Sequence, residues 1–178
     1  MGAYTYTIDP AHSNVKFWVR HLGISKVHGT FSGVSGTVSL DPSAPEGASG
    51  EATIDINSIN TGQADRDGHL KSAEFFDVAT YPTMAFTTTG ITKDGEGEYT
   101  LAGNLTLHGV TKPVSFKAEV SPELKNPMGP GYKIGLSLSG KITRDDFGLT
   151  YNMALEAGGW AIGKEVHLDL DIEIDRPE

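Results

Sequence analysis

A strict alternation of apolar and polar residues near the C-terminus constrains the fold more than any other feature of the sequence. From residue 165 to residue 174 the chain reads EVHLDLDIEI, with an apolar side chain at every even position. Successive side chains of a β-strand point to opposite faces, so this segment predicts a strand with one dry face. The chain must therefore contain a sheet that covers an apolar interior.

The same pattern with a period of two recurs along the whole chain. Alternating apolar residues fall in the segments 4–8, 15–19, 52–56, 84–86, 99–107, 114–120 and 134–138. Turn-forming stretches rich in Gly, Pro and Asp separate several of these runs, as in DPSAPEGASG at 41–50 and KNPMGPG at 125–131. No stretch resembles an interdomain linker, so we expect one domain over residues 1–178.

About eight strands of this kind fit either an antiparallel sandwich or an up-and-down barrel. Small residues at inward positions, such as Ala52, Gly103 and Ala118, would leave space inside the sheet. An eight-stranded barrel encloses an interior that side chains can fill or that can hold one small ligand. The small inward residues therefore favour a barrel.

The segment 27–40 breaks the pattern, because Val27 and Phe31 are at odd positions whereas Val34, Val38 and Leu40 are at even ones. A slip of one residue exchanges the two faces of a strand, and a β-bulge restores the register. We predict a bulge and a bend near residues 32 and 33.

One stretch predicts a helix, from about Gln63 to Phe76, with Thr61 as its N-cap. Acidic residues in its first turn favour this assignment. The sequence RDDFGLTYN at 144–152 predicts a second, shorter helical turn.

Charge and composition exclude several classes of function. The 178 residues include 14 basic and 23 acidic ones, a formal charge of −9 that would repel a nucleic-acid backbone. No apolar run reaches the length of a membrane span, so no stable membrane insertion is expected. The N-terminal segment lacks the pattern of a secretory signal, which predicts a cytoplasmic protein, or a periplasmic or secreted one if a signal peptide has been removed.

Catalytic and metal-binding patterns are weak. The six histidines form no HxH, HxxxH or HExxH pair, and the sequence contains neither cysteine nor a G-x-S-x-G elbow. The adjacent carboxylates Asp145 and Asp146, and the pair Glu74 and Asp77, have a simpler interpretation as turn and helix-end residues. We therefore expect no enzyme, no metal and no cofactor.

Aromatic residues gather around the predicted helix at Phe75, Phe76, Tyr81 and Phe86. They predict either core packing or a lid whose apolar face seals one end of a cavity. Trp18 falls on the face opposite its strand neighbours and predicts an exposed aromatic or a subunit contact.

Four stretches together resemble the YceI-like family of polyisoprenoid-binding, lipocalin-like barrels. They are DPAHSNVKFWVRHLGISKVHGTFSGVSG at 9–36, INTGQADRDGHLKSAEFFDVATYPTMAF at 59–86, LTLHGVTKPV at 105–114 and ITRDDFGL at 142–149. This resemblance implies an all-β fold: an elongated antiparallel eight-stranded lipocalin-like β-barrel with a small helical insertion around residues 63–76. It also implies a homodimer.

The resemblance further implies binding, storage or transport of a long apolar amphiphile inside the barrel. The ligand would be a polyisoprenoid or isoprenoid quinone precursor, a fatty acid or a fatty amide. The predicted lipid-binding residues are Phe17, Val19, Phe31, Ile54, Ile56, Leu70, Phe75, Phe76, Phe86, Leu105, Leu107, Phe116, Leu136, Leu138, Trp160 and Leu168. The candidates for holding the head group are His21, His69, His108 and Arg144.

Two other functions fit the same sequence. An enzyme acting on such a lipid would use His21, His69 or Arg144 near the mouth of a cavity. A structural or interaction protein would instead have a filled core, because side chains alone can fill a barrel of this size.

Overall fold

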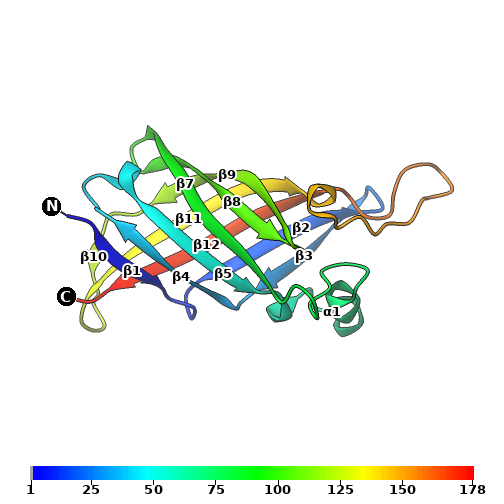
Figure 1. The fold of residues 1–178 in the computed structure, drawn as a ribbon, viewed down its shortest axis with the longest axis horizontal. Helices are drawn as coiled ribbons and strands as arrows, with labels where there is room; N and C mark the ends of the chain where they lie inside the picture. Colours follow the sequence, from blue (N-terminus) through cyan, green and yellow to red (C-terminus); the bar gives the residue numbers. More distant parts are fainter. Residues whose placement is uncertain (1) are drawn as a thin grey trace.

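The structure, a computed structural model, describes residues 2–178 and is an antiparallel β-barrel with one short helix (Figure 1). Its helix is α1 (Ala64–Lys71), and three short 3-10 turns cover Pro45–Gly47, Ile56–Ser58 and Arg144–Phe147. The strands are β1 (Tyr4–Ile8), β2 (Asn14–His21), β3 (Ser25–Phe31), β4 (Val34–Leu40), β5 (Ser49–Asp55), β6 (Ile59–Asn60), β7 (Thr83–Gly95), β8 (Glu98–Leu107), β9 (Val110–Val120), β10 (Leu124–Lys125), β11 (Tyr132–Thr143) and β12 (Glu165–Arg176).

The strands close into a barrel of eight positions, which confirms the predicted fold class. At three of these positions two consecutive strands lie end to end, namely β1 and β2, β3 and β4, and β5 and β6. The barrel closes between β11 and β12, which pair along their whole length from Tyr132↔Arg176 to Thr143↔Glu165. Closure pairs each of the eight positions on both sides over at least part of its length, which reduces the edge available for pairing with other chains.

Burial along β12 shows where the interior is solid. Ile172 and Ile174 are buried, whereas Val166, Leu168 and Leu170 point to the same face but are only half-buried. Because all five positions face inward, the half-buried ones must border empty space. The barrel is therefore filled at the end where β12 finishes and hollow toward the end where it begins.

The predicted bulge at residues 32 and 33 is confirmed. β3 ends at Phe31, β4 begins at Val34, and the Val34 amide donates a hydrogen bond to the Ser32 carbonyl (3.1 Å). Before the bulge the buried residue, Phe31, is at an odd-numbered position, whereas after it the buried residues Val34 and Leu40 are at even-numbered positions. The extra residue thus keeps apolar side chains inside on both halves of the bent strand.

The helix is shorter than predicted. α1 ends at Lys71, and the residues up to Thr80 form turns, with Asp77 in a left-handed conformation (φ 48°). Thr61 does not cap the helix, because its amide and hydroxyl both donate to Asp67 Oδ1 (2.9 and 2.5 Å). The second predicted turn is present only at 144–147 and ends at Gly148 (φ 75°).

A polar cluster seals the filled end, where β1 begins and β12 finishes (Figure 1). The buried Tyr6 hydroxyl donates to Glu123 Oε1 (2.5 Å), and Arg176 Nε donates to the same oxygen (2.7 Å). Burial, together with the hydrogen bond to Glu123, raises the pKa of Tyr6 to about 12. Arg176 also stacks over the rings of Tyr4 and Tyr132 at 4.0 and 3.9 Å.

None of the helices among the described residues has the length and apolar character needed to cross a membrane.

Candidate binding cavity

A cavity of about 620 Å³ occupies the hollow part of the barrel. Its wall follows β12 from Val166 to Ile172 and β11 from Ile142 to Leu136. At about 3.3 Å per residue, the lined stretch of β12 is roughly 20 Å long. The volume is within the range of about 300 to 1,000 Å³ that small-molecule sites occupy.

The cavity is blind at the filled end. Its lining includes Ile8 and Ile172, but the next inward residues on the same strands, Tyr6 and Ile174, do not contribute to it. Tyr6 and Ile174 are fully buried, and Ile134 has only 2% of its surface exposed. A layer of tightly packed side chains therefore closes the bottom of the cavity beneath the Tyr6–Glu123–Arg176 cluster.

Glycines keep the lumen open by giving aromatic rings a place against the wall. A side chain at Gly29 would collide with the Phe17 ring, and one at Gly103 with the Phe86 ring. A third ring, Phe116, covers Gly140 in the same way. Because each ring lies over a residue without a side chain, it contributes apolar surface without filling the centre of the barrel.

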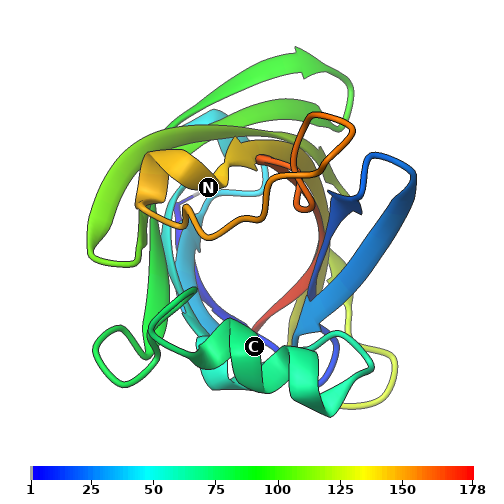
Figure 2. The same ribbon diagram turned by 90° about the vertical axis from the view of Figure 1, so that its right-hand side faces the viewer.

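The open end is covered in part by α1 and by the loop of residues 149–163 (Figure 2). The His69 ring packs edge-on against Phe75 and Tyr151, with both pairs of ring centroids 5.0 Å apart. His69 Nε2 also lies 2.5 Å from Glu74 Oε2. The helical segment and the loop thus meet in one aromatic cluster above the cavity.

A second aromatic contact runs from the helical segment into the barrel. Phe76 packs edge-on against Phe31 at 6.0 Å, and Phe31 contacts Phe17 at 5.4 Å. Phe75 is buried and Phe76 half-buried, and both line the cavity. The two predicted alternatives, core packing and a lid, therefore apply to the same residues. Phe75 and Phe76 pack against other aromatic rings and also close one end of the cavity.

Arg144 holds the loop of residues 149–163 from inside. Its Nη1 donates to the carbonyls of Leu149 (2.6 Å) and Tyr151 (2.9 Å), while Nε donates to Gly163 (2.9 Å) and Nη2 to Ile162 (3.3 Å). The side chain is almost fully buried, and this desolvation lowers its pKa. Four of the five guanidinium N–H groups are occupied, which leaves at most one for a ligand.

Most of the predicted lipid-binding residues lie on the cavity wall, and their contact with a ligand stays a prediction. The residues on the wall are Phe17, Val19, Phe31, Ile54, Leu70, Phe75, Phe76, Phe86, Leu105, Leu107, Phe116, Leu136, Leu138 and Leu168. Two predicted residues are placed elsewhere. Ile56 is fully buried in the core outside the cavity, and Trp160 is on the exterior of the loop, with 54% of its surface exposed.

Of the predicted head-group residues, His21, His69 and Arg144 border the cavity. His108 does not: its Nδ1 lies 3.2 Å from the Phe147 carbonyl, and its ring packs against Tyr81. The β8–β9 turn carries His108 away from the lumen, so we correct this assignment. The alternative in which His21, His69 or Arg144 acts as a catalyst stays a hypothesis.

Sequence reasoning missed several polar lining residues near the mouth, among them Arg66 and Tyr151. Arg66 donates to the hydroxyl and carbonyl of Thr61, both at 2.7 Å. Its position on the helix, one turn before the predicted Leu70, was the available signal. Tyr151 belongs to a loop without periodicity, which gives no comparable signal.

Trp18 lies on the outer surface of the barrel, as its position in the strand predicts. Its ring stacks on that of His167 at 3.7 Å, and Lys26 Nζ is 4.2 Å above it. These contacts leave Trp18 half-buried rather than fully exposed. A subunit contact at this residue stays a prediction.

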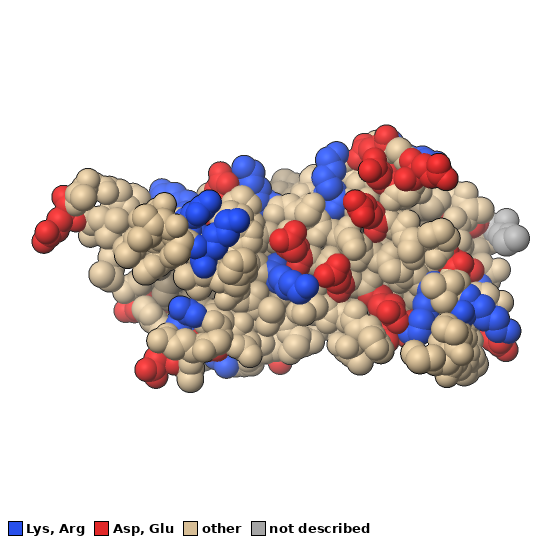
Figure 3. All heavy atoms as spheres, turned by 180° about the vertical axis from the view of Figure 1, so that it is seen from behind, with Lys and Arg blue, Asp and Glu red and all other residues tan. Residues whose placement is uncertain are grey.

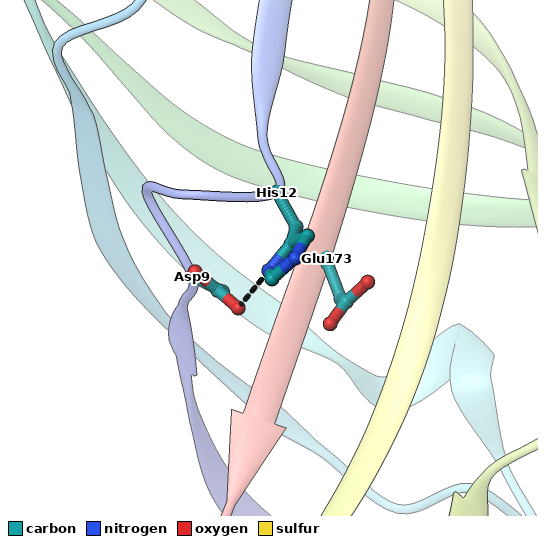
Figure 4. A group of neighbouring side chains, drawn as sticks. All are labelled: Asp9, His12 and Glu173. Carbon is teal, nitrogen blue, oxygen red and sulfur yellow. Dashed lines mark hydrogen bonds and ion pairs between the residues drawn. The ribbon is translucent and has the colours of Figure 1, made fainter. Parts of the chain in front are cut away.

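Within residues 2–178 the structure also gathers a set of metal-type ligands that the sequence did not predict, formed by Asp9, His12 and Glu173 (Figure 4). Their ligand atoms lie within 4.8 Å of one another. However, Lys133 Nζ is 2.5 Å from Glu173 Oε1 and 3.6 Å from Asp9 Oδ2, and it also contacts Asp175 (2.8 Å). The ammonium supplies the positive charge that these carboxylates require, so we interpret the cluster as structural.

The fold and the cavity together define a class: a small antiparallel barrel with a blind apolar interior and one covered mouth. Comparison with known proteins agrees with this class. The YceI-like domain matches residues 6–174. Protein YceI of Salmonella arizonae is 39% identical over 173 residues, which cover 96% of this chain and 86% of that protein.

Solved structures show the same barrel. The Campylobacter jejuni YceI protein superposes with a TM-score of 0.74 at 34% identity, covering 89% of this chain and 90% of that one. A polyisoprenoid-binding domain from Saccharophagus degradans has a TM-score of 0.69 at 20% identity, covering 97% and 98% of the two chains. The chain belongs to the YceI-like family, as the four sequence stretches indicated.

Proposed function

We propose that the protein binds one long apolar amphiphile, with its tail in the blind cavity and its polar end at the mouth. The observation that carries this proposal is a cavity of about 620 Å³ whose wall consists mainly of apolar strand residues. The polar lining residues Arg66, His69 and Tyr151 are found at the mouth, on the helical segment and the loop. A cavity of this size does not agree with the alternative of a filled core.

Simple energetics support a ligand without any catalytic group. Each buried CH₂ contributes about 0.8 kcal/mol, so a tail of about 15 carbons would contribute roughly −12 kcal/mol. Loss of rigid-body freedom and ordering of the tail cost on the order of 4 to 15 kcal/mol. The difference is compatible with a dissociation constant in the micromolar to nanomolar range.

We propose an isoprenoid or acyl tail as the ligand class, because apolar and aromatic side chains predominate on the strand wall, beside a few polar residues such as Glu51 and Thr88. The polyisoprenoid-binding domain of Saccharophagus degradans, which shares the fold, supports the isoprenoid form of this proposal. Fatty acids and fatty amides would use the same apolar wall. Storage or transport would follow from burial of such a tail away from water.

Native mass spectrometry of the protein purified from its own source, followed by analysis of its lipid extract, tests the proposal. We expect one amphiphile per chain and a rise in melting temperature when long-chain quinone or fatty acid is added. Leu170→Trp should exclude the ligand, because Leu170 is half-buried on the cavity wall. The control Leu170→Met conserves volume and should retain it.

A lipid-free extract from native protein, together with no stabilisation by added amphiphile, would contradict the proposal. Equal ligand content in Leu170→Trp and Leu170→Met would place any bound lipid outside the cavity.

A further inference from the structure

Large apolar side chains are exposed around the mouth of the cavity. Ile24 is 78% exposed and Leu22 41%, both in the turn between β2 and β3. Met153 and Trp160, in the loop of residues 149–163, are 59% and 54% exposed. We call these four residues the apolar rim. Exposed apolar groups that cluster in this way mark a contact surface.

Backbone hydrogen bonds join the two segments that carry the apolar rim. The Leu22 amide donates to the Ala161 carbonyl, and the Gly163 amide to the Arg20 carbonyl, both at 2.8 Å. An isolated β-bridge also joins His21 to Ile162. The hairpin turn and the loop are thus held side by side, at the end of the barrel opposite the termini (Figure 1).

Two positive charges flank the apolar rim on the outer wall. Arg20 and Lys26 are directly opposite each other in the β2–β3 register and both lie over the ring of Trp18, at 5.5 and 4.2 Å. Neither forms an ion pair with a carboxylate of residues 2–178. Figure 3 shows basic side chains gathered on this face near the open end.

Like charges opposite each other across a strand pair are unfavourable. Arg20 and Lys26 lie beside exposed apolar groups, in a chain whose formal charge is −9. This local positive charge favours an anionic partner at this surface. Glu156, between Met153 and Trp160, is the opposing charge on the loop.

We propose that the apolar rim docks onto the surface of an anionic lipid bilayer. Apolar and indole side chains partition into the bilayer interface, where a Trp ring meets both hydrocarbon and water. Each basic residue near an anionic surface adds attraction. A second copy of the chain fits less well as the occupant, because a two-fold contact through the rim would bring two Arg20–Lys26 pairs together.

Docking goes beyond ligand binding and is measured without it. Lipid-free protein is centrifuged with vesicles of phosphatidylcholine alone or of equimolar phosphatidylcholine and phosphatidylglycerol. We expect binding to the anionic vesicles, weakened by added salt because screening reduces the electrostatic attraction. No binding to anionic vesicles, or equal binding to both kinds, would overturn the proposal.

Substitutions locate the contact. Ile24→Ser should lower the partition coefficient by about tenfold, since it removes one large apolar side chain from the contact. Lys26→Gln should lower it by about fivefold on anionic vesicles only. Glu156→Gln should strengthen binding. Met128→Ser is the matched control, because Met128 is 84% exposed but lies in the turn between β10 and β11, away from the rim.

Equal losses in Ile24→Ser and Met128→Ser would overturn the proposal. A rim-dependent dimer in sedimentation velocity, without vesicle binding, would assign the surface to a second copy instead. Ile24 does not line the cavity, so the Ile24→Ser protein should retain its ligand. Failure of docking is therefore distinguishable from failure of ligand binding.

Discussion

Arg144 holds the mouth of the cavity in shape with a single side chain. Its guanidinium binds carbonyls at both ends of the loop of residues 149–163, and the loop in turn supplies Tyr151 to the aromatic cluster with His69. Because the donors are arranged in a planar fork, no other side chain can reach all four oxygens.

We predict that Arg144→Lys lowers the free energy of unfolding by about 2 to 4 kcal/mol, because the ammonium leaves several buried carbonyls without a donor. Urea denaturation measures the loss, and amide hydrogen exchange should show faster exchange in residues 149–163. Unchanged protection in the loop would contradict this role. Lys164→Gln is the control, since Lys164 pairs with Asp145 on the surface.

The His12–Asp9 contact makes stability depend on pH. The hydrogen bond that His12 Nδ1 donates to the Asp9 carboxylate (2.7 Å) raises the pKa of His12 and lowers the pKa of Asp9. A raised histidine pKa contributes stability that is complete below the unfolded value of about 6.5 and is lost as pH rises through the folded value. The lowered pKa of Asp9 contributes stability that is lost as pH falls below about 4.

We therefore predict that wild-type protein exceeds His12→Asn in stability mainly between about pH 4 and 6.5, with the difference declining above that range. Thermal unfolding of both proteins across pH measures it. A difference that is constant from pH 5 to pH 9 would show that His12 contributes through packing alone. Glu173 and Lys133 also face this site, so Lys133→Met serves as a second reference.

Among the strands, the paired glycines and phenylalanines decide whether the barrel stays hollow. We predict that Gly103→Ala displaces the Phe86 ring into the lumen and also strains the backbone at the Thr87 carbonyl, with a cost of about 1 to 3 kcal/mol and reduced ligand capacity. Ligand content by native mass spectrometry and the urea midpoint measure both effects. Gly90→Ala, on the neighbouring strand, has open space around it and should change neither.

The strands and the bulge could be predicted from sequence because their signal is local. The switch from Phe31 to Val34 changes the buried face within a few residues, and only an inserted residue accommodates it. The end of α1 could not be predicted, because the turns after Lys71 depend on contacts with the barrel. The Arg144 clamp and the Lys133 cluster depend on residues brought together by barrel closure, and no spacing in the sequence reveals them.

The barrel as a molecular container has a floor whose position should select the length of the ligand. Ile174 lies in the layer directly beneath the cavity. We predict that Ile174→Ala costs about 2 to 5 kcal/mol and deepens the cavity. Mass spectrometry of the extracted lipid should then show longer tails than in wild type. Ile174→Leu conserves volume and should leave the distribution of tail lengths unchanged. Unchanged tail lengths in Ile174→Ala would contradict a role of the floor in selection.

A homodimer and the cellular compartment stay predictions for this chain. Sedimentation velocity with and without ligand would measure the first, and it would also show whether Trp18 lies at a subunit contact.

The solid floor beneath Ile172 has a kinetic consequence. An amphiphile of the proposed kind would have to enter a cavity with one mouth tail-first and leave it head-first, because it could neither turn round inside nor pass through the closed end. Loading and unloading would then share one route and one barrier, and a protein that transports such a ligand would have to present the same face first to the donor and then to the acceptor. A change that loosens the mouth would accelerate entry and exit equally. The net direction of transfer would then depend on the relative affinities of the donor and the acceptor for the ligand.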